Sequence, residues 1–146
     1  MKSRHLARSL AVQTLYALDF NSELSEELYP FKGLFPGRSD EEMNELETHI
    51  VIYAYYLING VLQNLTEIDK VISVYSSRKI ERISIVDRNI LRISVFSFYY
   101  EKNIDFAIII DEAVKLSQQL SNEINFKFIN GVLDSVRKDL NDSVEK

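Results

Sequence analysis

The scarcity of glycine and proline constrains this chain more than any other feature of its sequence. The 146 residues contain only four glycines and two prolines, and both prolines and two of the glycines lie within residues 30–37. A β-rich protein needs turn residues at regular intervals, whereas a chain of long helices does not. The sequence therefore predicts an all-α fold, with residues 30–38 as its clearest loop.

Apolar spacing and capping residues predict about seven helices. The first is expected over residues 3–19, with a buried stripe of Ala7, Leu10, Ala11, Thr14, Leu15 and Leu18. A short helical turn is expected at 22–28. Three pairs have the spacing of a capping box at a helix start: Ser39 and Glu42, Thr66 and Asp69, Ser84 and Asp87. The expected helices are 39–63, 66–75, 84–100, 105–120 and one that ends near 140, before a frayed polar tail at 141–146.

The composition indicates a binding protein rather than an enzyme. The chain has no cysteine, so it has no disulfide or thiolate metal site, which fits the reducing cytoplasm. Neither a signal peptide nor a membrane-spanning run is visible. His5 and His49 lie in no ligand pattern, and the glycines match no phosphate-binding loop. We therefore expect no catalytic residue, no metal, no cofactor and no membrane contact.

Positive charge is concentrated at the N-terminus of an otherwise acidic chain. The first eighteen residues contain no acid, whereas residues 19–47 are rich in acids and the whole chain carries a net charge of −5. On a helical wheel, the face opposite the buried stripe combines cations with an amide and a phenol. Such a face can bind RNA phosphates and bases. A protein partner and a merely solvated face remain open alternatives. The members of this face are Lys2, Arg4, His5, Arg8, Gln13 and Tyr16.

Several segments resemble one bacterial protein family. They are AVQTLYALD at 11–19, NGVLQNLTEIDKVI at 59–72, VDRNILRIS at 86–94, DEAVKLSQQLS at 111–121 and KFINGVLD at 127–134. Their order and spacing are similar to those of the NusB family of transcription antitermination factors over nearly the whole chain.

The resemblance implies a fold and a function. It implies two small packed helical subdomains, at about 1–64 and about 65–140, in a single NusB-like domain without catalysis. It also implies binding to the single-stranded boxA element of ribosomal RNA leaders together with NusE, a small-subunit ribosomal protein, within an RNA polymerase antitermination complex. Ribosomal RNA transcription is thereby promoted.

The family motifs also imply the site residues. Arg4, His5 and Arg8 stand in the arginine-rich N-terminal motif, and Gln13 and Tyr16 match its Q-x-L-Y pattern. Lys127 and Phe128, at the start of the last helix, match a K-F pair that the family places near RNA.

Some positions depart from the family pattern. His5 and Leu6 stand where arginine is common, so we expect weaker RNA binding by the isolated protein. Ser97 stands where glutamate is usual, which concerns the NusE-facing surface and the core packing.

Two alternatives to RNA binding remain. One is a protein-only scaffold or a homodimerising module that uses the N-terminal helix. The other is the related domain of ribosomal RNA cytosine methyltransferases, which the sequence disfavours because no methyltransferase domain is present in its 146 residues.

We expect Arg8→Ala to weaken boxA RNA binding without unfolding the protein, because one phosphate-neutralising charge is lost. The slope of log affinity against log salt should fall by about one unit or less. Fluorescence anisotropy at several salt concentrations measures both quantities. Unchanged affinity in the double variant Arg4→Ala/Arg8→Ala would contradict the assigned site.

Overall fold

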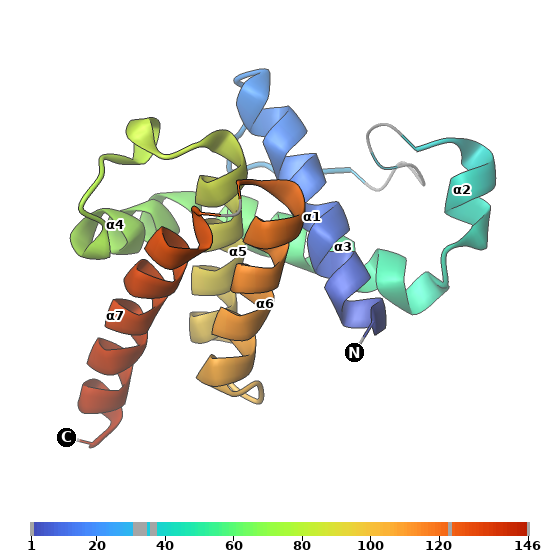
Figure 1. Cartoon of the computed structure of the whole chain (residues 1–146). Helices are drawn as coiled ribbons and strands as arrows, with labels where there is room; N and C mark the ends of the chain where they lie inside the picture. The colour runs from blue at the N-terminus through green and yellow to red at the C-terminus, as the bar shows by residue number, and fades with distance from the viewer. Residues whose placement is uncertain (1, 31–34, 36–37, 123, 146) are drawn as a thin grey trace.

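Every regular element in the described part of the chain is a helix, which confirms the predicted all-α class. The computed structural model describes residues 2–30, 35, 38–122 and 124–145. Within these residues no helix is long and apolar enough to cross a membrane. Figure 1 shows the helices, which are α1 (Lys2–Phe20), α2 (Asp40–Glu45), α3 (Thr48–Gln63), α4 (Leu65–Tyr75), the 3₁₀ helix η1 (Ile80–Arg82), α5 (Ile85–Tyr100), α6 (Phe106–Leu120) and α7 (Phe126–Glu145).

Helix α5 is the centre of the bundle. It packs against α1, α3, α4, α6 and α7, and its side chains from Asn89 to Phe98 are all buried. A helix that is apolar on most of its circumference is expected to be surrounded in this way. The division into two helical subdomains stays a prediction, but α1 from the first half packs directly against α5 from the second.

Helix α1 buries the predicted stripe and ends without a glycine. Ala7, Leu10 and Leu15 are buried where α1 packs against α3 and α5. At its end Ser22 takes a left-handed φ of 55°. The Glu23 N–H then donates to the Leu18 carbonyl at 2.7 Å, which is the Schellman pattern that satisfies the last carbonyls of a helix. Residues 22–28 form no helix, so the predicted helical turn there is wrong.

The segment after α1 is attached to α3 through aromatic rings. Tyr29 and Phe35 both stack on Tyr55, with ring centroids 5.9 and 5.0 Å away. The Tyr29 N–H also donates to the Asn59 side chain at 2.6 Å. Phe35 is buried, so the loop predicted at 30–38 contributes to the core. Residues 31–34 and 36–37 of that loop lie outside the described residues.

Two of the three predicted capping boxes form. The backbone N–H groups of Glu42 and Asp87 donate to Ser39 and Ser84, each at 3.2 Å. The helix predicted from 39 to 63 is interrupted, because Glu47 takes an extended conformation between α2 and α3.

The third capping box is wrong. Thr66 lies inside α4, which begins one residue earlier, and its hydroxyl donates to Glu26 instead. The predicted frayed tail also differs, because α7 continues to Glu145.

Four charged side chains join α1, α4 and α5. Arg88 and Arg92 of α5 donate to the Asp19 carboxylate at 2.6 and 2.9 Å, and Arg92 also donates to Asp69 at 2.9 Å. Burial alone raises the pKa of Asp19, but the hydrogen bond from Arg88 and the charge of Arg92 outweigh it and hold that pKa below its usual value. A paired, hydrogen-bonded carboxylate of this kind makes the junction depend on its charge.

We expect Asp19→Asn to lower the free energy of unfolding by about 3 kcal/mol at pH 7, because Arg88 and Arg92 lose a buried counter-charge. The folded-state pKa of Asp19 lies below its unfolded value, so the stabilisation is complete above the unfolded pKa. It is lost as pH falls through the folded-state pKa. Urea unfolding between pH 7 and pH 2 should show the two proteins converging below about pH 4. A difference that stays constant down to pH 2 would contradict this account.

Candidate nucleic-acid interface

Arg4 forms the exposed end of a cation–aromatic contact at the start of α1. Its guanidinium carbon lies 5.4 Å from the centre of the Tyr53 ring on α3. The Tyr53 hydroxyl donates to Glu101 at 2.7 Å, and the Ser97 hydroxyl donates to the same carboxylate at 2.6 Å. The Glu101 carboxylate therefore reaches Ser97 from one helical turn later along α5. Burial and the Glu101 bond raise the pKa of Tyr53 and keep it a neutral donor.

A carboxylate on α6 contacts the next two basic side chains of α1. Glu112 lies 2.6 Å from His5 Nδ1 and 3.4 Å from the Arg8 guanidinium. The other ring nitrogen of His5 lies 2.7 Å from the Gln119 side-chain oxygen. The half-exposed His5 ring is therefore oriented by two residues of α6 that are more than 100 positions away in sequence.

The structure corrects the predicted exposure of one part of this face. Arg8 is only 6% exposed, although the helical wheel placed it opposite the buried stripe. Tyr53 and Glu112 cover this side of α1, with the Arg8 guanidinium 5.8 Å from the Tyr53 ring centre. The expectation that Arg8 is a freely exposed cation is wrong. Contact of Arg8 with RNA stays a prediction.

The later residues of the predicted face remain accessible on α1. Gln13 is half-buried and donates to Ser9 one turn earlier at 3.0 Å. Tyr16 is exposed and stacks on the exposed Phe20, with ring centroids 6.0 Å apart. Lys2 begins α1, but its side chain lies outside the described residues.

Lys127 and Phe128 begin α7, next to a cation that the sequence reading missed. Lys127 is exposed and Phe128 half-buried. The guanidinium of Arg78, from the segment after α4, lies 4.3 Å from the centre of the Phe128 ring. Nothing in the local sequence signals this contact, because fifty residues separate the two side chains. A shared face of Lys127 with α1 stays a prediction.

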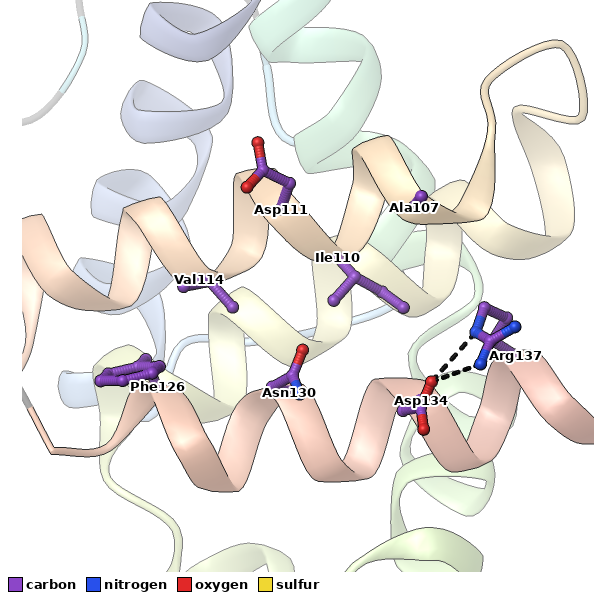
Figure 2. A pocket seen from close by; sticks show the side chains of 8 residues that line it. All are labelled: Ala107, Ile110, Asp111, Val114, Phe126, Asn130, Asp134 and Arg137. Carbon is purple, nitrogen blue, oxygen red and sulfur yellow. Dashed lines mark hydrogen bonds and ion pairs between the residues drawn. The ribbon is translucent and has the colours of Figure 1, made fainter.

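A groove between α6 and α7 offers no catalytic arrangement. Its volume is about 540 Å³, and Figure 2 shows Ile110 and Val114 of α6 opposite Phe126 and Asn130 of α7. The two carboxylates that line it are already paired, Asp111 with Lys115 at 3.1 Å and Asp134 with Arg137 at 2.6 Å. Among the described residues, no group of three or more metal-ligating side chains could hold an ion. The fold is thus all-α, with a basic N-terminal face as its candidate binding site.

Comparison with known proteins gives the family. The NusB family profile matches residues 5–138. The chain is 34% identical to the transcription antitermination protein NusB of Elusimicrobium minutum over 95% of this chain and 96% of that protein. It is 37% identical to the NusB of Campylobacter hominis over 94% and 98%. The protein belongs to the NusB family of transcription antitermination proteins. The relatives are named as transcription antitermination proteins, in agreement with the predicted class of protein.

Solved structures share this fold. NusB from T. maritima matches with a TM-score of 0.74 and 27% identity, over 92% of this chain and 90% of that one. A chain in the crystal structure of the antitermination factors NusB and NusE in complex with double-stranded RNA matches with a TM-score of 0.73 and 27% identity. That match covers 95% of this chain and 98% of the other.

We expect Arg8→Ala to reduce the free energy of unfolding by about 1–3 kcal/mol, because it removes a buried cation that bonds Glu112 and contacts Tyr53. Arg4→Ala is the matched control. Its side chain is exposed, so the change should stay within about 0.5 kcal/mol. Urea denaturation at pH 7 measures both variants, and equal losses would contradict the distinct structural role of Arg8.

Proposed function

We propose that this protein binds the boxA element of ribosomal RNA leaders as single-stranded RNA, together with NusE, in the cytoplasm. The observation that carries the proposal is the localised cationic site on α1. Exposed Arg4 lies over Tyr53 beside half-exposed His5, on a chain whose net charge is −5. Such a distribution directs an anionic partner to one place and repels it elsewhere. Family membership supports the proposal, and the neighbour that contains NusB and NusE with double-stranded RNA supports RNA and NusE as partners.

Each site residue has a proposed role. Lys2, Arg4 and Lys127 neutralise phosphates, while the Gln13 amide and the Tyr16 ring contact bases or the partner protein. Phe128 offers a ring to a base, with Arg78 already placed against it. Arg8 acts mainly by positioning, since Glu112 holds it together with His5.

The size of the site makes NusE part of the proposal. A few exposed cations give weak, salt-sensitive RNA binding, because affinity depends on the number of phosphates neutralised. NusE would add surface to the same RNA, and the pair would join the RNA polymerase antitermination complex. Ribosomal RNA transcription is the process that this assembly would promote.

A protein-only alternative has one observation in its favour. The exposed Tyr16 and Phe20 rings form a stacked apolar pair on α1. A second copy of the chain could cover that pair as a homodimer that hides the same helix. Sedimentation velocity over a hundredfold concentration range tests for this homodimer. A dimer that does not bind RNA would support the protein-only alternative.

We expect preferential boxA binding that tightens when NusE is added, measured by fluorescence anisotropy with a labelled boxA RNA and a scrambled control. Arg4→Ala and Lys127→Ala should each weaken binding and lower the salt slope by about one unit or less, while leaving stability unchanged. Ile108→Ala, on an exposed position of α6, is the control variant. Equal affinity for both RNAs in the presence of folded NusE would overturn the proposal.

A further inference from the structure

One side of α3 forms an exposed stripe that the RNA site does not use. Ile52, Tyr56 and Gly60 follow one another at intervals of four residues, which places them on one face of α3, and Asn64 follows as its C-cap residue. The Ile52 and Tyr56 side chains are 62% and 46% exposed. Large apolar side chains at adjacent turns form a continuous surface rather than isolated exposed residues.

Gly60 lets an aromatic ring from α5 lie directly on this stripe. A Cβ atom at Gly60 would lie 2.3 Å from the Phe96 ring, so only glycine allows this approach. The Phe96 ring meets Tyr56 edge-on at 5.5 Å and stacks on Tyr100 at 5.0 Å. Tyr100 is 54% exposed. Buried Phe96 therefore holds two tyrosines in place, one on either side, with their rings accessible to solvent.

A pocket continues this surface between α4 and α5. It has a volume of about 340 Å³, near the lower end of the range for small-ligand sites. The Tyr100 hydroxyl donates to the Asn64 side-chain oxygen at 2.9 Å and so fixes one edge of the pocket. The pocket lining is Asn64, Glu67, Ile68, Val71, Val95, Tyr99 and Tyr100. We call this lining together with Ile52 and Tyr56 the tyrosine face.

Carboxylates lie in and beside the tyrosine face. Glu67 lines the pocket and forms an exposed ion pair with Lys70 at 3.6 Å, so its charge is partly balanced. Burial and the charge of Glu101 raise the pKa of Tyr56, while burial and the charge of Asp139 raise that of Tyr99. Phosphates would be repelled by the same groups, which disfavours RNA here.

We propose that the tyrosine face binds a basic protein segment, whose arginine or lysine side chains lie on the Tyr56 and Tyr100 rings beside Glu67. An aliphatic side chain of the segment occupies the pocket over Ile68, Val71 and Val95. Guanidinium groups are well suited to exposed tyrosine rings. The chain itself contains such a contact between Arg78 and Phe128, at 4.3 Å. Tyr56 stacks on Tyr53 of the proposed RNA site, with ring centroids 6.1 Å apart, so the two surfaces are neighbours. Separate peptide and RNA probes therefore distinguish a failure of this proposal from a failure of the RNA site.

The test is an NMR titration of the full-length, ¹⁵N-labelled protein with three defined probes. The first is a blocked hexapeptide of alternating arginine and leucine, the second has glutamate in place of arginine, and the third is an RNA hexanucleotide. We expect saturable shifts of the Glu67, Tyr99 and Tyr100 amides with the arginine peptide only. Binding should weaken about two- to fivefold for each ring removed in Tyr56→Ala and Tyr100→Ala. It should also weaken in Glu67→Gln, and Ile108→Ala is the control.

Each other outcome overturns the proposal. Absence of saturable shifts at these amides, or equal shifts with the glutamate peptide, would show that the face has no preference for cations. Shifts with RNA would make the face an extension of a nucleic-acid site. Concentration-dependent shifts without any probe would assign the face to a second copy of the chain. Because Glu67 is exposed, Glu67→Gln keeps the test decisive even where a tyrosine variant unfolds.

Discussion

The rest of the structure depends on the ion pairs between the Asp19 carboxylate and Arg88 and Arg92. It is the point where α1 meets the two arginines of α5, and through Arg92 it is connected to Asp69 on α4. Two cations held in a mostly buried position are stable only while their counter-charges stay in place. The end of α1 is therefore fixed by charge, and the apolar stripe on the same helix is fixed by packing against α3 and α5.

The candidate site depends on that placement of α1. Because α1 lies across the bundle, Glu112 and Gln119 of α6 can reach His5, and Tyr53 of α3 can lie beneath Arg4. The N-terminal cations are thus divided by their surroundings. Arg4 stays available to an anionic partner, whereas Arg8 forms an ion pair with Glu112 inside the protein. Fewer cations on α1 are free to bind RNA than the sequence suggests. Under the proposed function, RNA binding therefore depends more on the surface that NusE adds.

Sequence reasoning succeeded where the signal is local. Helix α5 begins at the predicted capping box of Ser84 and Asp87 and ends at Tyr100 as expected. Sequence reasoning failed where a helix boundary or the exposure of a side chain depends on a distant contact or on an unusual backbone conformation. The helix predicted from residue 39 breaks at extended Glu47. The helical turn predicted at 22–28 is absent, and Ser22 takes a left-handed φ just after α1 ends at Phe20. The helical wheel also left Arg8 exposed, because a wheel shows the faces of one helix and not its neighbours.

The sequence by itself determined the all-α class, the family resemblance and the cationic character of the first turns, because each of these depends on composition or on spacing within a few residues. Only the tertiary structure decided which cations are exposed, how Phe96 lies against Gly60, and how four charged residues join three helices. These features depend on pairs of residues separated by tens of positions. Such pairs meet only when the helices pack, and no periodicity along the chain records which side chain will face which.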